Sequence, residues 1–205
     1  MNKVTFLKFP LFIILTAILL CSAQVSRATT FTVTNLNNSG TNSLREAINL
    51  INADDTTTHI IAFSVNGTIN LTSALPNINQ TARTFIDPGT GRTITLIGNT
   101  MGFVSPTVFN GGNFSVSTNS GIIGSSNLTV ARNATATLSV LNGADVSNTI
   151  GIIGENAGSS GAVTVDGAGS SWTNNGNLYV GNSGTGVLNI TNGGTVSNSI
   201  GYIGR

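Results

Sequence analysis

LSVLNGADVSNTIGIIG, residues Leu138–Gly154, returns fifty positions later as LNITNGGTVSNSIGYIG, residues Leu188–Gly204. Ten of the 17 positions are identical, and the alignment needs no gap. Both copies begin with alternating apolar and polar residues and then reach an Asn-Gly pair, which is typical of a strand that ends in a tight turn. A repeat at a fixed period indicates a solenoid, a propeller or an array.

A third, more diverged copy lies between these two. VTVDG, residues Val163–Gly167, matches the first strand and its turn at an offset of 25 residues. Trp172 falls near the position of Val146, and Leu178–Gly181 matches Gly151–Gly154 after a two-residue insertion. The unit is therefore about 25 residues long, and it is predicted to contain a strand, a turn, a second strand, a short strand and a Gly-rich turn.

The length of this unit favours one kind of repeat fold. A unit of about 25 residues is too short for a propeller blade, which needs roughly 40. One unit cannot bury its apolar face alone, but stacked units bury it together while their backbones pair. Pro is absent after Pro106, which suits strands that all donate to a ladder. We therefore predict an all-β fold, a parallel β-helix or β-solenoid.

The first half of the chain shows a different pattern. Ser43 and Glu46 have the spacing of a capping box, and the residues on one face of the following helix are apolar: Leu44, Ala47, Ile48 and Ile51. Strands are expected around it at 31–34, 59–63, 67–71, 85–87 and 93–97. A solenoid end exposes an apolar core and unpaired strand edges, so we expect this short helix to cap it. Residues 29–120 are assigned to this capping module and residues 121–205 to the repeats.

Residues 1–28 have the order of a secretory signal peptide. Lys3 and Lys8 precede the apolar run Leu11–Leu20, and small residues then offer cleavage after Ala23 or after Ala28. The apolar run is too short for a membrane span, which needs roughly 20 residues. We therefore expect an exported protein that is secreted or held at the cell surface.

The mature chain is weakly charged and has no cysteine after either cleavage site. After Ala28 it contains five Arg, no Lys and seven carboxylates, which gives a formal charge of −2 with His59 neutral. Binding to nucleic acid needs clustered Lys and Arg, so it is not expected. Disulfides cannot form, and stability has to come from burial and backbone hydrogen bonds.

The repeats resemble the autotransporter-associated repeat of type V secreted proteins, which also occurs in some exosortase-sorted surface proteins. The residues that carry this resemblance are VDGAGSSW (165–172), LYVG (178–181) and GVLNITNGG (186–194). The resemblance covers about residues 121–205. It implies a structural repeat without assigned catalytic residues.

The capping module resembles the opening segment of bacterial β-helix surface proteins that contain SLREAI, here Ser43–Ile48. Gly67–Leu71, Leu75-Pro76 and Ile86–Gly89 extend the resemblance over about seventy residues. Many members have Cys before this Ser, whereas this chain has Asn42. The resemblance implies the N-terminal cap of a right-handed parallel β-helix in a secreted or outer-membrane protein.

Few residues are candidates for chemistry. The single His59 opens a predicted strand and is interpreted as structural. Asp54-Asp55 could begin a calcium site, but no spaced ligand loop follows, and a turn at the helix end is favoured. Asp145 and Asp166 could pair across coils as acid and base. Asp is also common in turns, which is the interpretation favoured here.

Two aromatic residues stand out in a repeat built from aliphatic residues. Trp172 and Tyr179 could stack on a sugar, although core filling and the repeat signature explain them better. We therefore assign no catalytic, cofactor-binding or metal-binding residue, and we expect neither enzyme activity nor a cofactor.

These observations predict an exported structural or adhesive passenger fragment of an autotransporter, which acts by surface contact with glycans, matrix or a host surface. One alternative is a β-helix polysaccharide lyase or hydrolase, and another is an exosortase-sorted protein associated with exopolysaccharide. Contact with a membrane is expected only through a C-terminal translocator or anchor. Because the chain stops at Arg205, directly after a repeat, we expect it to be a truncated form of a longer protein.

Overall fold

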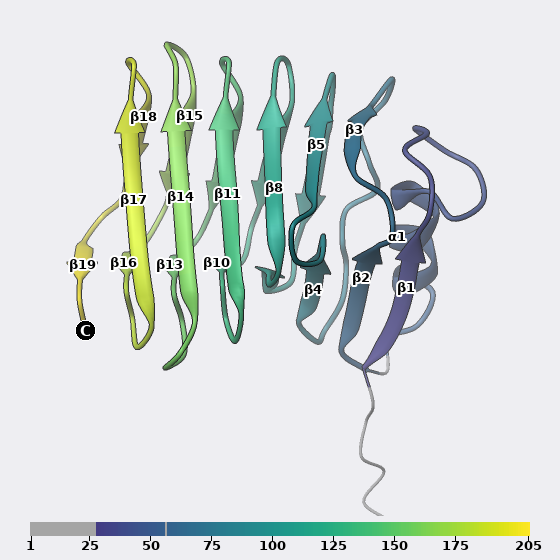
Figure 1. The fold of residues 1–205 in the computed structure, drawn as a ribbon, viewed down its shortest axis with the longest axis horizontal. Coiled ribbons are helices and arrows are strands. Elements are labelled where there is room, and N and C mark those ends of the chain that lie inside the picture. Colours follow the sequence, from purple (N-terminus) through teal and green to yellow (C-terminus); the bar gives the residue numbers. More distant parts are fainter. Residues whose placement is uncertain (1–27, 56) are drawn as a thin grey trace, which may run out of the picture.

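The computed structural model describes residues 28–55 and 57–205. Apart from Ala28, the predicted signal peptide lies outside the described residues. In the described part, the chain winds into a solenoid whose turns build three stacked parallel sheets (Figure 1).

The strands of each sheet come from successive turns, and every neighbouring pair is parallel. Sheet A contains β1 (Thr29–Val33), β2 (His59–Phe63), β4 (Thr84–Asp87), β7 (Thr107–Phe109), β10 (Leu128–Val130), β13 (Gly151–Ile153), β16 (Leu178–Val180) and β19 (Gly201–Ile203). Sheet B contains β3 (Gly67–Asn70), β5 (Thr93–Ile97), β8 (Gly112–Ser117), β11 (Thr135–Leu141), β14 (Ser160–Asp166) and β17 (Thr185–Thr191). Sheet C contains β6 (Thr100–Phe103), β9 (Gly121–Gly124), β12 (Asp145–Asn148), β15 (Ser171–Asn174) and β18 (Thr195–Ser197).

The solenoid is right-handed. In Figure 1 the strands of sheet B run upward at the front and the chain returns downward behind them, while successive turns advance from right to left. Each complete turn passes through sheets A, B and C in that order, beginning with β4, β5 and β6. The predicted fold class, a right-handed parallel β-helix with one short N-terminal helix, is confirmed.

Strand register confirms the repeat alignment. Leu138 pairs with Val163, which pairs with Leu188, so that paired residues of β11, β14 and β17 lie 25 positions apart. In sheet C, Trp172 lies beside Val146, as the alignment predicted. One residue of the insertion before Leu178 lies between β14 and β15 and the other between β15 and β16, so Leu178 still pairs with Gly151.

The core is a column of inward-facing side chains. Along β11 and β14 every second residue is buried, as expected when side chains alternate between the inside and the outside of a coil. The largest buried side chains are Trp172, Phe103, Phe109 and Phe114, and the last two stack with ring centroids 4.5 Å apart. Burial of this column supplies most of the favourable free energy of folding.

Helix α1 (Leu44–Asn52) closes the N-terminal end of the column. All four predicted apolar residues, Leu44, Ala47, Ile48 and Ile51, are buried in the same core as the strands. Ser43 caps the helix and its side chain accepts a hydrogen bond from the Glu46 N–H at 3.2 Å. Figure 1 shows α1 beside β1 and β2 at the right-hand end of the solenoid.

One detail of the predicted capping box is wrong. The Glu46 carboxylate accepts from the backbone N–H of Asn42 and does not return to the N–H of Ser43. The Ser43 N–H is already bonded to the Gly40 carbonyl at 3.1 Å, in a turn that places Asn42 at a positive φ of 58°. In residues 28–55 and 57–205, no helix has the length and apolar character required to cross a membrane.

Candidate functional site

The corners that join sheet A to sheet B have unequal lengths. Residues 88–92 connect β4 to β5, residues 110–111 connect β7 to β8, and residues 131–134 connect β10 to β11. The shortest corner therefore lies between two longer ones that belong to the neighbouring turns. A short corner leaves room that its longer neighbours enclose, and this produces a notch in the side of the solenoid.

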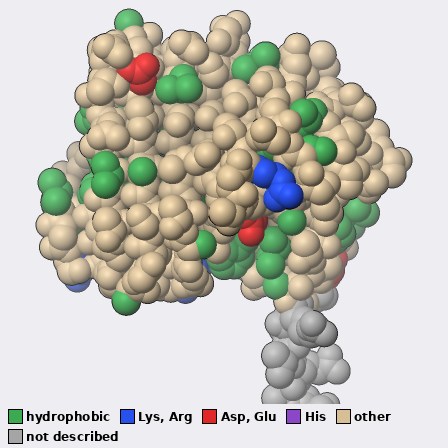
Figure 2. Space-filling view, viewed as in Figure 1, with side chains coloured by type: hydrophobic (Ala, Val, Ile, Leu, Met, Phe, Trp, Pro, Cys, Tyr) green, Lys and Arg blue, Asp and Glu red, His purple; other side chains and the backbone are tan. Residues whose placement is uncertain are grey.

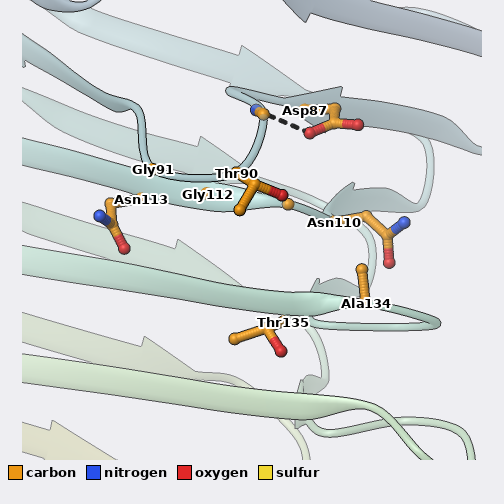
Figure 3. Close-up of a pocket in the computed structure, with 10 residues that line it drawn as sticks. Asp87, Thr90, Gly91, Asn110, Gly112, Asn113, Ala134 and Thr135 are labelled. Carbon is orange, nitrogen blue, oxygen red and sulfur yellow. Dashed lines mark hydrogen bonds between the residues drawn. The ribbon is translucent and has the colours of Figure 1, made fainter.

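The notch is a cavity of about 510 Å³ that is lined by polar side chains, glycines and Ala134. This volume is within the range of roughly 300–1,000 Å³ that is usual for small-molecule sites. Its polar side chains are those of Asp87, Thr90, Asn110, Asn113 and Thr135. In Figure 3, Asp87 and Thr90 lie on one side of it, Ala134 and Thr135 on the other, and Asn110 at one end.

The side chains of Asp87 and Asn110 are held by hydrogen bonds from backbone N–H groups. One polar group of each side chain remains without a partner among the described residues. Asp87 Oδ1 accepts from the Gly89 N–H at 2.8 Å, and Oδ2 has no partner in the described chain. Asn110 Oδ1 accepts from the N–H groups of Arg132 at 3.0 Å and Asn133 at 2.9 Å. Its amide Nδ2 makes no hydrogen bond to the described residues. The lining of the notch thus keeps one available acceptor on Asp87 and one available donor on Asn110.

At the opposite end of the notch, both polar atoms of the Asn113 amide already have hydrogen-bond partners. Asn113 Nδ2 donates to Thr93 Oγ1 at 3.2 Å, and Asn113 Oδ1 accepts from Thr137 Oγ1 at 2.6 Å. Asn113 therefore links three turns and has a structural role. The hydroxyl groups of Thr90 and Thr135 have no partner among the described residues, so they can both donate and accept.

Glycine keeps the floor of the notch open. A Cβ on Gly111 would lie 2.1 Å from Asp87 Oδ1, and a Cβ on Gly112 would lie 2.3 Å from the Gly89 carbonyl oxygen. Both glycines also have positive φ angles, 149° and 60°. Any side chain at these two positions would displace the Asp87 loop.

Most of the other charged side chains have structural partners. The Glu155 carboxylate forms ion pairs with Arg83 Nη1 at 3.1 Å and with Arg132 Nη1 at 2.5 Å. Arg83 precedes β4 and Glu155 follows β13, so the pair crosses the outer face of β7 and β10. The outward-facing Val108 and Thr129 of these two strands are buried.

The remaining arginines are placed as follows. Arg45 donates to the carbonyl oxygens of Asn38, Ser73 and Ala74, which ties α1 to two loops. The Arg92 guanidinium lies against Gly89 at the rim of the notch, where a Cβ on Gly89 would be 2.4 Å from its Nη1.

His59 and the Asp54-Asp55 pair hold the cap together. His59 is buried, and its Nε2 lies 2.5 Å from the Asp54 carbonyl oxygen, while its ring is 5.8 Å from that of Phe31. Asp55 Oδ1 accepts from both the N–H and the hydroxyl of Thr81. The helix ends at Asn52, before the two aspartates.

Asp145 and Asp166 lie on opposite arms of the corner between sheets B and C. Asp145 begins β12 and Asp166 ends β14, so the two are not register partners. Asp145 Oδ1 accepts from Ser171 Oγ at 2.6 Å. Hydrogen bonds from Thr191 and then from Asn192, each 2.6 Å long, lower the pKa of Asp166 from its ordinary value of 3.8. Each carboxylate fastens its turn to the next.

The two aromatic candidates serve coil-to-coil packing. Trp172 is buried, so it cannot stack on an external ligand. Tyr179 stacks on Tyr202 of the next turn with centroids 4.9 Å apart and an interplanar angle of 6°. The Arg205 guanidinium lies 5.7 Å from the first ring and 5.8 Å from the second.

Of the features described, the notch is the one that combines a cavity with unpaired polar groups. Sequence reasoning missed it because neither Asp87 nor Asn110 belongs to a recognisable chemical motif. A signal does exist in DPGTGR (87–92) and NGGN (110–113), two Gly-rich turns of different length at equivalent corners. In residues 28–55 and 57–205, no group of three or more His, Cys, Asp or Glu side chains could hold a metal ion.

Comparisons of the chain with protein-family models, with curated proteins and with solved structures found no significant match.

Proposed function

We propose that the chain is an exported cell-surface protein that acts by contact, as a structural or adhesive passenger of an autotransporter. The observation that carries this proposal is a row of neutral polar side chains along the outer face of sheet B. Register places one residue of the row on each turn: Thr68, Thr95, Ser115, Ser139, Thr164 and Asn189. Ser115 is buried, and the other five are at least partly exposed.

The physical character of this face suits contact rather than chemistry. Neighbouring strands of a sheet are about 4.8 Å apart, so the row offers hydroxyl and amide groups at a fixed, short interval. Figure 2 shows few charged side chains on this side of the molecule. Such a surface can make many weak hydrogen bonds to a polymer or to a neighbouring surface, and many copies on one cell multiply their effect.

The signal-peptide pattern at the N-terminus and the two sequence resemblances support export and display. Purely structural display and adhesion differ in whether the surface binds a partner. The polar row and the notch favour adhesion, because both present unused hydrogen-bonding groups on a rigid scaffold.

The test is to locate the chain on cells that produce it from its own gene and to measure their adhesion. An epitope inserted after Gly158 suits this purpose, since Gly158 is an exposed corner residue with open space around it. We expect antibody to label intact cells, and we expect these cells to adhere to glycan-coated surfaces more than cells that lack the gene. Labelling only after permeabilisation would contradict display, and equal adhesion would contradict the adhesive role.

A further inference from the structure

We infer that the notch between the β4–β5, β7–β8 and β10–β11 corners is a binding site for a single uncharged sugar unit of a glycan. This inference rests on the proposed contact function and gives it a specific site. The notch is a built feature of the fold, because the corner lengths, the glycine floor and the fixed orientation of two side chains all contribute to it.

The unpaired polar groups indicate a hydroxyl-rich ligand. Asp87 Oδ2 can only accept a hydrogen bond when ionised, and Asn110 Nδ2 can only donate one. A sugar hydroxyl both donates and accepts, so two neighbouring hydroxyls can satisfy both groups at once. The free hydroxyls of Thr90 and Thr135 extend the same kind of contact to the two sides of the notch.

Other ligand classes fit this lining poorly. No aromatic side chain lines the cavity, so a nucleobase would have nothing to stack on. Apart from Ala134 the lining lacks apolar side chains, which disfavours a lipid or a hydrophobic peptide. An anionic sugar would approach the negative charge of the Asp87 carboxylate, which forms no ion pair with the described residues.

Pre-organisation adds to this argument. Backbone N–H groups fix Oδ1 of both Asp87 and Asn110, so their free atoms are held in place before a ligand arrives. Binding then costs little side-chain entropy. The notch also lies beside the polar row of sheet B, since Asn113, which lines it, is two residues from Ser115 on the same face of β8. A glycan held in the notch could continue over that face.

Two substitutions remove the open groups without disturbing the hydrogen bonds that orient them. Asp87→Asn keeps Oδ1 for the Gly89 N–H but turns the free acceptor into a donor. Asn110→Asp keeps Oδ1 for the two backbone N–H groups but turns the free donor into an anionic acceptor. Asp145→Asn is the matched control for Asp87→Asn, because it makes the same change of charge at the first residue of β12, outside the notch.

The experiment is a titration of the full chain with four neutral tetrasaccharides, built from glucose, mannose, galactose or N-acetylglucosamine, and with tetragalacturonate as the acidic counterpart. Binding would be followed by calorimetry and by amide NMR signals, including those of Gly89, Gly111 and Gly112. We expect at least one neutral sugar to bind and to shift these signals. Asp87→Asn and Asn110→Asp should each weaken its binding roughly tenfold or more, as expected for the loss of a hydrogen bond that involves a charged or pre-oriented group.

Three results would overturn the inference: no neutral sugar binds, binding is unchanged in both notch variants, or tetragalacturonate binds more tightly than every neutral sugar. Melting curves of the three variants show whether each is folded, and the two notch variants test the same site independently. Labelling of intact cells decides surface display separately. If the protein is displayed and its glycan binding is unchanged by substitution of Asp87 and Asn110, the notch is not the glycan site, but the proposed function is not contradicted.

Discussion

The Trp172 indole Nε1 donates a 2.7 Å hydrogen bond to Oδ1 of Asn148, and both side chains are fully buried. Asn148 Nδ2 in turn donates to Oδ1 of Asn174, its register partner on the next turn, at 2.8 Å. A polar chain thus joins two turns within the core. It also requires Gly151, because a Cβ there would lie 2.3 Å from Asn174 Oδ1 and 2.7 Å from the indole ring.

Removal of the central residue of this chain should be costly. In Asn148→Leu the buried indole N–H and the Asn174 carbonyl both lose their partner, so we expect a loss of about 1–3 kcal/mol in the free energy of unfolding. Denaturant unfolding followed by the fluorescence of Trp172, the single tryptophan, measures it directly. Ser147→Ala, one residue away on the outer face, is the control. Equal stability of the two variants would show that the hydrogen bonds of Asn148 contribute nothing to the free energy of unfolding.

The cap helix offers a matched pair of substitutions. Ile48 is 0% exposed and Leu50 is 46% exposed on the same helix. Ile48→Asp buries an unpaired carboxylate, which costs several kcal/mol, and it should lower the melting temperature and cause aggregation. Leu50→Asp should change stability by no more than about 0.5 kcal/mol. If Ile48→Asp melts at the wild-type temperature, α1 does not cap the core.

Asp166 should titrate below its ordinary value. Hydrogen bonds from Thr191 and Asn192 lower its pKa in the folded state, so the stabilisation they provide is present above pH 3.8 and is lost as the pH falls through the lowered pKa. A carbon-detected NMR titration of the carboxyl group measures the midpoint. Thr191→Val and Asn192→Ala should each raise it toward 3.8. A midpoint that both substitutions leave unchanged would remove these bonds as the cause.

The mature chain should begin at Gln24 or at Thr29. Thr29 is the first residue of β1 and pairs with His59, so cleavage after Ala28 leaves this strand complete. Mass spectrometry of exported protein decides between the two sites. Intact Met1 in the exported fraction would refute the signal peptide.

Much of the fold was predictable because a solenoid copies its register from turn to turn. Once Leu138–Gly154 was aligned with Leu188–Gly204, the pairing of sheets A, B and C over these turns followed. The turns from β4 to β9 show no clear repeat in the sequence, since their corners differ in length and the two-residue corner Asn110-Gly111 stands where later turns have a longer one. The cap helix was found from its spacing, whereas the bond from Glu46 to Asn42 depends on a turn that spacing does not reveal.

The notch could not have been read from the sequence in the same way. It arises from the difference between three corners that lie more than 20 residues apart, and its open atoms are known only once Gly89, Arg132 and Asn133 are seen to occupy the other oxygens. Asp145 and Asp166 were easier to notice as carboxylates near turns. Asp145 follows the β11–β12 corner and Asp166 precedes the β14–β15 corner of the next turn, and these places depend on where each strand begins and ends.

We propose that this chain binds glycan and leaves it chemically unchanged. The most direct test is to incubate the full chain with the neutral tetrasaccharides, and also with pectin, alginate and peptidoglycan, with and without calcium. Both the complex and the recovered sugars are then analysed by mass spectrometry. We expect a complex with at least one neutral tetrasaccharide and full recovery of every substrate at its original mass. Shortened or unsaturated products that disappear in Asp87→Asn, Asp145→Ala or Asp166→Ala would contradict it and would identify the chain as an enzyme.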